Sequence, residues 1–361
     1  MPSTRPDIRM DEQGVCSACR AYERRPTVDW SARAADFQRL MAEQRGLYIP
    51  HPVYDCVVAS SGGKDSHFIA IKALELGYHP LVVTASTDFP TALGRRNIEN
   101  LKNLGLDTLE FTPNPVVRKK LNRIGLEEVG DIEWPEHAAI FGLPVRIAQD
   151  MGIGIVLYGE NPQSEYSGGP QDAILLDRRW REEFGGLLGL RPKDLIGREG
   201  LTAADLWPYE YPLDSSLPVH GLFLGQFYEW HGMKNALIAQ AHGFEAYPHV
   251  VEGNLVNFEN LDNADVGLHD YFGFLKYGFG RATVMCSLYV RRGMLTRDEA
   301  VMLARRLDGH RPMSYLGVSL VSILRDIGLD WDRYLAIEDR FANGTILEKS
   351  DDEWKLRELI A

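Results

Sequence analysis

A glycine-rich turn between a short apolar run and an amphipathic segment constrains the fold more than any other feature of this chain. Residues 56–59 predict a buried strand, and residues 66–76 place apolar side chains on one helical face. Between them stands Ser-Gly-Gly-Lys-Asp-Ser at residues 61–66. Two glycines let the backbone approach a phosphate, and the unpaired N–H groups at a helix start attract anions. The stretch therefore predicts a phosphate site at the end of a strand.

Two common phosphate motifs do not fit this turn. A Walker loop needs Gly-Lys followed by Ser or Thr, with another glycine six residues before the lysine. Here Asp65 follows Lys64, and Val58 stands six residues before the lysine. A dinucleotide fingerprint needs a third glycine, separated from the second by two residues, and the turn has none. The turn instead resembles the pyrophosphate loop of ATP pyrophosphatases, which cut ATP between its α and β phosphates.

Length and charge narrow the class of protein. With 361 residues, the chain is long enough for two domains or for one large domain with additions. Its net charge of −12 argues against a general binder of nucleic acids. No apolar run approaches the roughly 20 residues of a membrane span, and the N-terminus lacks the apolar core of a signal peptide. We therefore expect a cytoplasmic protein that does not bind membranes.

The four cysteines divide into two kinds. Cys56 and Cys286 stand in apolar runs and are expected in the core. Cys16 and Cys19 form Cys-x-x-Cys, a spacing that supplies half of a four-thiolate zinc site or a redox pair. The chain has no second close pair, so a plain thiol pair in a loop stays an equal alternative to a metal site.

Short strands alternate with helices after residue 54. Further strands are predicted at 80–85, 108–111 and 155–158, and helices at 94–104 and 144–150. Strands separated by helices indicate an α/β fold, a doubly wound parallel sheet covered on both faces. Ligands of such sheets bind at the carboxyl ends of the strands. The strand tips to consider are residues 60–66, 84–91, 112–123 and 159–166.

Polar residues gather at one of these tips and in a later glycine-rich stretch. Residues 159–166 suit a hydroxyl-rich substrate or Mg²⁺, with a solvated loop as the alternative. Residues 118–123 are basic, and either hold phosphate oxygens or form a solvated helix face. Residues 269–281 bring a His-Asp pair and two cations together, and here a functional and a structural role are equally open. Further on, Thr296 and Glu299 form a capping box that starts a helix over 300–307.

Beyond the loop, the chain resembles the N-acetyl sugar amidotransferases of bacterial surface-polysaccharide and O-antigen synthesis, which belong to the ATP pyrophosphatase (PP-loop) superfamily. The matching stretches include Tyr158-Gly-Glu-Asn161, His269-Asp-Tyr271 and Lys276-Tyr-Gly-Phe-Gly-Arg-Ala-Thr283. The other matches are residues 4–8, 11–12, 14–19, 61–66, 94–97, 111–114, 165–166, 224–225, 252–253, 292–293 and 296–300. The resemblance thus runs from near the N-terminus to about residue 312.

The resemblance implies four regions and a reaction. The regions are an N-terminal segment with the cysteine pair and a helix (1–50), an ATP-binding core (51–166), a substrate-binding insertion with the rest of the core (167–290), and a helical C-terminal region (291–361). The family is understood to convert an acetamido group of a nucleotide-activated sugar into an acetamidino group. The acetamido oxygen attacks the α-phosphate of ATP, pyrophosphate leaves, and ammonia then displaces AMP.

The same resemblance implies roles for the residues that match. The departing pyrophosphate would be held by Ser61, Gly62, Gly63, Lys64 and Ser66. Asp65 would orient the loop or a Mg²⁺ ion, and Ser60 and Thr84 would contact AMP. The residues expected to face the sugar or the adenylated amide are Glu160, Asn161, Glu165 and Tyr166. Lys276 and Arg281 would neutralise phosphate oxygens, and His269 and Asp270 would handle protons as ammonia adds.

The source of ammonia is expected to be another protein. The chain has no Gly-x-Cys-x-Gly nucleophile motif, and its second residue is proline, so it offers no N-terminal cysteine nucleophile. The resemblance therefore implies a separate glutaminase subunit as partner. Zn²⁺ at Cys16 and Cys19 is a further expectation, although the family usually carries another Cys-x-x-Cys upstream.

Two departures from the family pattern keep other functions open. Residues 284–286 are apolar where an acidic residue is usual, and residues 131–137 also differ from the pattern. One alternative is ATP-dependent sulfur transfer to a nucleobase or another amide, which shares the adenylation step. The sparse cysteines and the negative charge disfavour it. Another alternative is a nucleotide-binding regulator without catalysis.

Overall fold

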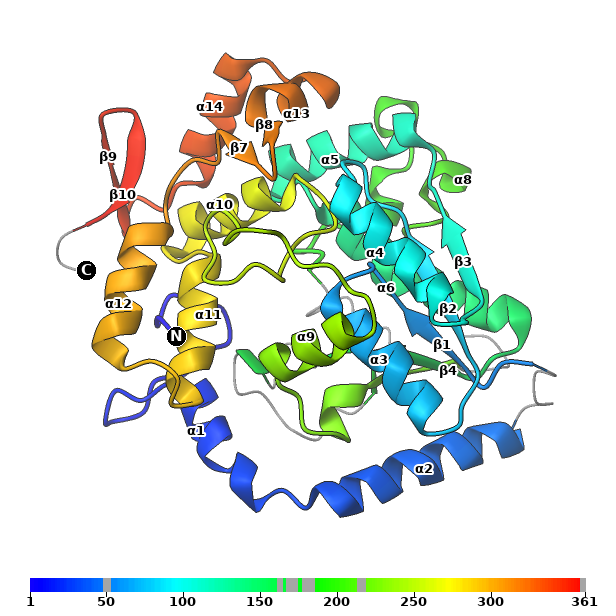
Figure 1. Cartoon of the computed structure of the whole chain (residues 1–361). Helices are drawn as coiled ribbons and strands as arrows, with labels where there is room; N and C mark the ends of the chain where they lie inside the picture. Colours follow the sequence, from blue (N-terminus) through cyan, green and yellow to red (C-terminus); the bar gives the residue numbers. More distant parts are fainter. Residues whose placement is uncertain (48–52, 161–164, 167–174, 177–185, 213–218, 358–361) are drawn as a thin grey trace.

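A computed structural model describes residues 1–47, 53–160, 165–166, 175–176, 186–212 and 219–357. Its centre is a six-stranded sheet in the order β3-β2-β1-β4-β6-β5, and all neighbouring pairs but the last are parallel (Figure 1). The strands are β1 (Cys56–Ala59), β2 (Pro80–Ala85), β3 (Thr108–Phe111), β4 (Ile155–Tyr158), β5 (Leu175–Leu176) and β6 (His220–Phe223). The predicted α/β class and the four predicted strands are confirmed.

The strand order reverses between β1 and β4. From β1 the chain proceeds outward through β2 to β3, and then returns to place β4 on the other side of β1. In an open parallel sheet, the crevice beyond the carboxyl ends of the strands at such a reversal is where ligands bind. The turn that follows β1 and the turn that follows β4 both open into this crevice.

Helices cover both faces of the sheet, as the alternation along β1 requires. Val58 packs in one core with Phe68 of α3 (Lys64–Glu75) and Phe37 of α2 (Trp30–Leu47). Its neighbour Val57 packs in another core with Val145 of α6 (Trp134–Met151). Helices α3 and α6 therefore lie on opposite faces of the sheet.

Helix α9 packs against α3, and the helices that follow it form a second part of the molecule. A separate apolar core joins α10 with α13 and α14, and it includes Phe272 and Tyr334. The α-helices after β6 are α9 (Gly232–Ala241), α10 (Val266–Tyr277), α11 (Arg281–Arg291), α12 (Arg297–Leu307), α13 (Leu320–Asp326) and α14 (Trp331–Phe341). One small hairpin, β7 (Ser314–Tyr315) with β8 (Val318–Ser319), lies between α12 and α13, and another, β9 (Leu347–Ser350) with β10 (Glu353–Leu356), follows α14. None of the helices in the described ranges combines the length and the apolar character of a membrane span.

Three elements differ from the sequence-based expectation. The helix expected at 144–150 begins ten residues earlier, at Trp134, and carries Pro144 within it. Helix α5 (Pro115–Val129) was not expected, although Asn114 caps it and Pro115 opens it. Strand β6 lies in a stretch that looked irregular, because four residues are too few to show a period.

Candidate active site at the reversal of strand order

The loop after β1 has a backbone shape that requires glycine. Gly62 has φ of +83°, a left-handed conformation that other residues rarely adopt. A Cβ at this position would also lie 2.6 Å from Cγ1 of Ile98, which belongs to α4 (Ala92–Asn103). The Gly62 N–H donates to the Ser60 hydroxyl oxygen at 3.0 Å. The conformation of the loop is thus stabilised by its own hydrogen bond and restricted by the neighbouring helix α4.

Helix α3 begins directly after this loop. Gly63 is its N-cap residue, and no side chain among the described residues caps the helix. The Ser66 hydroxyl donates back to the Gly63 carbonyl at 2.9 Å. The first N–H groups of a helix need partners from outside it, and a phosphate provides them well. The structure therefore places an uncapped helix start in the crevice of the sheet.

Lys64 is almost fully buried, with 4% of its side chain exposed. Its ammonium is paired with the Asp65 carboxylate and, at 2.8 Å, with Oε1 of Glu259. Burial alone would lower the pKa of Lys64, but the two carboxylates outweigh it and raise the pKa. Lys64 therefore remains a cation at the helix start. Its present partners are two carboxylates, and bound phosphate oxygens could take their place.

The structure adds three residues to this loop that the sequence pattern did not suggest. Asn235 of α9 is 1% exposed and donates to Oδ1 of Asp65 at 3.1 Å. Glu259 pairs with Lys64, and the Asp262 carboxylate is hydrogen-bonded to Ser61. Each stands far along the chain in a segment without a motif. In the sequence these residues differ from apolar ones only in being polar or acidic, and many surface residues share that property. The sequence therefore gave no reason to select them.

Glu160 follows β4 and faces the same crevice. It lines a cavity of about 350 Å³, counting the open mouth, together with Lys64, Asp65 and Trp230. The Tyr166 hydroxyl donates to its Oε1 at 3.1 Å. Burial, together with the Asp65 charge, raises the pKa of Glu160 to about 7. Asn161, the other predicted substrate contact of this turn, lies outside the described residues.

Glu165 is bound on both sides by arginine. Its carboxylate pairs with Arg25 at 3.1 Å and with Arg292 at 2.8 Å, and its carbonyl accepts from Arg291 at 2.7 Å. The side chain is 11% exposed. In this arrangement Glu165 joins the N-terminal segment to α11, and its predicted contact with a sugar remains a prediction.

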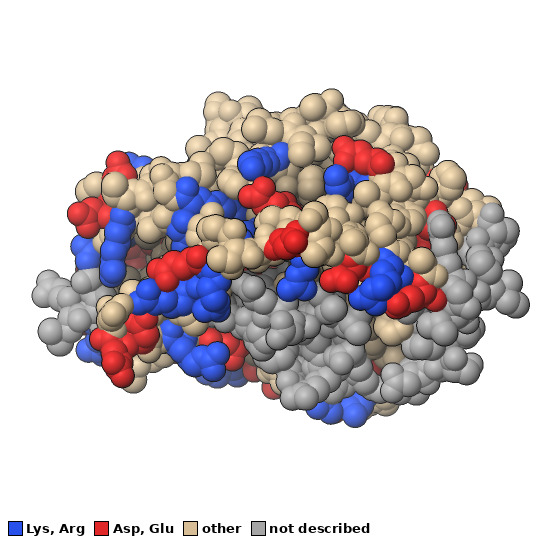
Figure 2. All heavy atoms as spheres, turned by 90° about the horizontal axis from the view of Figure 1, so that it is seen from below, with Lys and Arg blue, Asp and Glu red and all other residues tan. Residues whose placement is uncertain are grey.

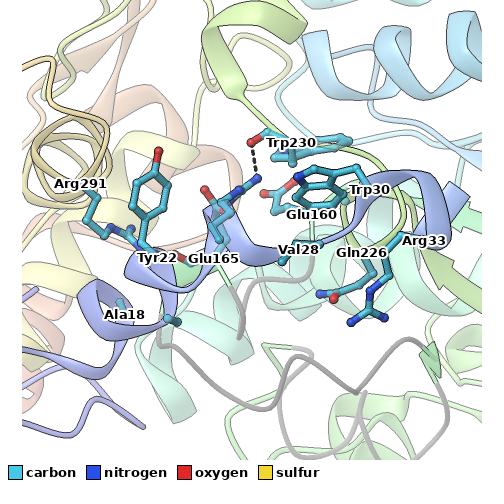
Figure 3. Close-up of a pocket in the computed structure, with 13 residues that line it drawn as sticks. Ala18, Tyr22, Val28, Trp30, Arg33, Glu160, Glu165, Gln226, Trp230 and Arg291 are labelled. Carbon is cyan, nitrogen blue, oxygen red and sulfur yellow. Dashed lines mark hydrogen bonds and ion pairs between the residues drawn. The ribbon is translucent and has the colours of Figure 1, made fainter.

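A larger cavity lies between the N-terminal segment and the core. It measures about 600 Å³, counting its mouth, and Glu160 and Glu165 line both this cavity and the smaller one. Figure 3 shows Tyr22, Trp30 and Trp230 among its lining residues. Aromatic faces beside arginine and carboxylate groups are the mixture that binds a planar, polar ligand.

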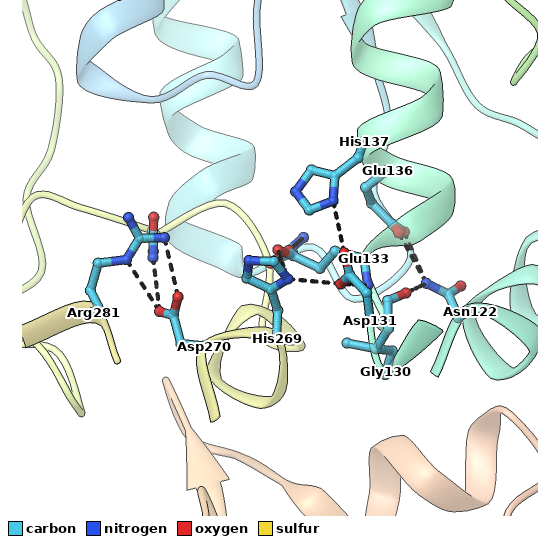
Figure 4. A network of polar contacts seen from close by, with 12 residues as sticks. Asn122, Gly130, Asp131, Glu133, Glu136, His137, His269, Asp270 and Arg281 are labelled. Carbon is cyan, nitrogen blue, oxygen red and sulfur yellow. Dashed lines mark hydrogen bonds and ion pairs between the residues drawn. The ribbon is translucent and has the colours of Figure 1, made fainter. Parts of the chain in front are cut away.

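The residues expected near 269–281 lie in two polar groups. Asp270 pairs with Arg281 at 3.2 Å, so the predicted proton handler and the predicted phosphate ligand neutralise each other here (Figure 4). The His269 Nδ1–H donates to Asp131 at 2.7 Å. The Lys276 ammonium donates to the carbonyls of Val129 and Gly130 at 3.2 and 3.0 Å, and burial lowers its pKa. Their roles with phosphate and protons stay predictions.

The cysteine pair and the predicted AMP contacts complete the expected set. The Sγ atoms of Cys16 and Cys19 lie 3.5 Å apart. A thiol hydrogen bond from Cys19 lowers the pKa of Cys16 to about 4. Among the described residues, no third metal ligand joins this pair, and zinc binding there stays a prediction. Thr84 is 3% exposed and stands one residue before the end of β2.

Surface charge of both signs is mixed. In the space-filling view from below, lysine and arginine side chains lie beside aspartate and glutamate side chains (Figure 2). The described residues of this face show no continuous basic track of the kind that follows a nucleic-acid backbone.

Comparisons with known proteins give a family match in the C-terminal third. Residues 244–360 match the family model described as LPS biosynthesis protein WbpG-like, C-terminal domain. No curated protein matches the sequence. Among solved structures, the NMN synthetase from Francisella tularensis is similar, with 15% sequence identity and a TM-score of 0.29. That match covers 62% of this chain and 99% of the synthetase.

Proposed function

We propose, on the premise that residues 244–360 belong with the WbpG-like LPS biosynthesis proteins, that this chain is an ATP-dependent amidotransferase of lipopolysaccharide biosynthesis. It would convert an acetamido group of a nucleotide-activated sugar into an acetamidino group, with release of AMP and pyrophosphate. The observation that carries this proposal is the loop at residues 61–66. It joins an uncapped helix start to a buried lysine at the reversal of strand order.

The proposed chemistry activates a weak electrophile. An amide carbon resists ammonia because its oxygen is a poor leaving group. In the first step the amide oxygen forms a bond to the α-phosphorus, and the bond from that phosphorus to the bridging oxygen breaks, releasing pyrophosphate. In the second step ammonia adds to the imidate carbon, the carbon–oxygen bond breaks, and AMP leaves with that oxygen. Loss of a proton from the added nitrogen completes the amidine.

The loop residues suit the first step. The N–H groups at the start of α3 and the Lys64 ammonium would hold the two phosphates that leave, so that charge is neutralised where it develops. Ser61 and Ser66 add hydroxyl donors, and Ser60 and Thr84 remain the proposed AMP contacts. Asp65 and Glu259 offer the carboxylate oxygens that Mg²⁺ prefers. When bound there, Mg²⁺ would supply further charge neutralisation on the phosphates.

Glu160 suits the second step. It lies in the same cavity as Lys64 and Asp65, next to the position that the α-phosphate and the amide would share. A carboxylate whose pKa is about 7 is half ionised at neutral pH, which is the best value for a general base there. We propose that Glu160 accepts the proton that the added nitrogen loses. Tyr166 holds the carboxylate in place through its hydroxyl.

The first prediction concerns products and the nitrogen donor. Incubation of the purified chain with ATP, ammonium chloride and an acetamido sugar nucleotide should yield AMP, pyrophosphate and a product in which NH has replaced one oxygen. Glutamine should not replace ammonium, because the nitrogen is expected from a separate glutaminase. Mass spectrometry of the sugar and of the nucleotide measures both outcomes.

Other products would contradict the proposal in specific ways. Formation of ADP would exclude attack at the α-phosphate. A product heavier by the difference between sulfur and oxygen, formed with sulfide, would favour the sulfur-transfer alternative. Pyrophosphate release that does not depend on any acceptor, or no release at all with tight ATP binding, would favour a nucleotide-binding regulator. Activity with glutamine as the only nitrogen source would contradict the proposal that a separate glutaminase supplies the ammonia.

The second prediction concerns pH. The rate of amidine formation, corrected for the concentration of free ammonia, should rise with pH through about 7, because only the ionised Glu160 carboxylate accepts a proton. Glu160→Gln should lower kcat by about 100-fold or more and flatten this pH profile. Glu229→Gln, at a carboxylate that is 57% exposed, serves as the matched control. It should keep the parental kcat and the parental pH profile. An unchanged profile in the Glu160 variant would assign the base elsewhere.

A further inference from the structure

Two histidines converge on one buried carboxylate away from the ATP loop. The Asp131 carboxylate accepts from Nδ1 of His269 at 2.7 Å and from Nδ1 of His137 at 3.2 Å. The two imidazole rings lie 5.1 Å apart at an angle of 66°. One ligand atom from each of the three residues lies within 4.8 Å of the others. Figure 4 shows both rings turned toward Asp131.

Separate elements of the fold bring these groups together. Asp131 stands in the turn between α5 and α6, His137 lies in the first turns of α6, and His269 lies in α10. Asp131 is 2% exposed, whereas the side chains of His137 and His269 are 24% and 30% exposed. The carboxylate is thus fixed in the interior, and the two imidazoles separate it from solvent without closing the site.

Further acidic side chains are buried beside this cluster. Glu133 and Glu136 are each 7% exposed, and Asp265 is fully buried. Both carboxylate oxygens of Asp265 lack a hydrogen-bond partner among the described residues. Oε2 of Glu133 lies 3.9 Å from Nδ1 of His269. Carboxylates without partners are costly in the interior, and a bound cation is one means of offsetting that cost.

We propose that Asp131, His137 and His269 bind one divalent first-row transition-metal ion of the Zn²⁺ or Fe²⁺ type, with a coordination position left open. Two imidazoles and one carboxylate form the donor set of catalytic zinc sites and of open iron(II) sites. In the tautomer that carries its proton on Nε2, each imidazole has a free lone pair on Nδ1 for the metal. A metal bond from Nδ1 would then replace the hydrogen bond that each ring now donates to Asp131. The site differs from the Mg²⁺ expected with ATP and does not depend on the proposed reaction.

Metal binding by purified variants tests this proposal. Cys16→Ser/Cys19→Ser serves as the parent protein, because it removes the two thiols that could bind the same ions. After removal of metal with a chelator, titration with Co²⁺ without ATP should give one equivalent with visible d–d bands and no thiolate charge-transfer band. His137→Ala and His269→Ala, each made in this parent, should bind at least about 100-fold more weakly. His310→Ala, at an exposed histidine in another part of the chain, should bind as the parent does.

Two further measurements keep the result interpretable. Metal-free Tm values of the histidine variants establish that they fold, and added Zn²⁺ should raise the Tm of the parent but not of these variants. Elemental analysis after anaerobic loading with Zn²⁺ or Fe²⁺ distinguishes the two ions. The proposal is overturned if folded His137→Ala and His269→Ala proteins bind Co²⁺ as tightly as the parent. It is also overturned if the cysteine double variant alone abolishes binding.

Discussion

Lys64→Ala should lower kcat for pyrophosphate release by at least about 100-fold, the effect of removing one preorganised charge from a developing anion. The structure makes this effect specific, because Lys64 is buried at the helix start and has two carboxylates as its partners. Loss of its charge leaves Asp65 and Glu259 beside the phosphates without their lysine partner. Repulsion should then weaken ATP binding as well as slow the chemical step. Continuous measurement of pyrophosphate gives kcat and KM together.

A control on the same helix separates a local role from a general loss of charge. Lys72 also belongs to α3, but its side chain is 26% exposed and pairs with Glu75 at the surface. Lys72→Ala should keep kcat within about twofold, because surface ion pairs contribute little. The Tm of both variants shows whether they fold. If folded Lys64→Ala protein released pyrophosphate at the parental rate, the loop would not be the phosphate site.

Gly62→Ala should abolish ATP-dependent turnover through the shape of the loop rather than through its charge. The left-handed φ of +83° costs an L-residue roughly 1–2 kcal/mol. In addition, the new Cβ would meet Ile98 Cγ1 at 2.6 Å, so the loop or α4 must move. Phosphate binding needs the loop and the start of α3 in their present relative positions. We therefore expect a loss of about 100-fold or more in kcat/KM. Pyrophosphate release and ATP titration measure it.

Gly77 provides the matched control for backbone strain. Its φ is +78°, but a Cβ there would meet no atom within 4 Å. Gly77→Ala should therefore lower stability by about 1 kcal/mol and leave turnover unchanged. Adding Ile98→Ala to Gly62→Ala should restore part of the activity, because it removes the 2.6 Å contact with Cγ1 but neither the 3.1 Å contact with the Ile98 backbone nitrogen nor the strained φ. Equal loss of activity in the Gly62 and Gly77 variants would contradict the proposed role of the loop.

The local elements of the sheet were predictable because their causes are local. Short apolar runs mark β1 to β4, and the glycines of residues 61–66 mark the turn after β1. The fold class, and the position of this turn at a ligand-binding edge, follow from that alternation alone. Helix α5 could also have been predicted, since Asn114 and Pro115 are a strong start signal. Its start was missed because the basic residues that follow suggested either a phosphate-binding strand tip or a solvated helix face. Arg118 is in fact buried and pairs with Asp88 at 2.9 Å.

The sequence by itself therefore determined four strands of the sheet and the glycine-rich turn after β1, because hydrophobic period and turn chemistry act over a few residues. Only the tertiary structure decided which distant side chains complete the sites. Asn235 and Glu259 reach the loop, and His269 meets Asp131 across 138 positions of the chain. Such contacts depend on how helices pack against one another. The residue pattern of one segment does not indicate which distant segment will pack against it.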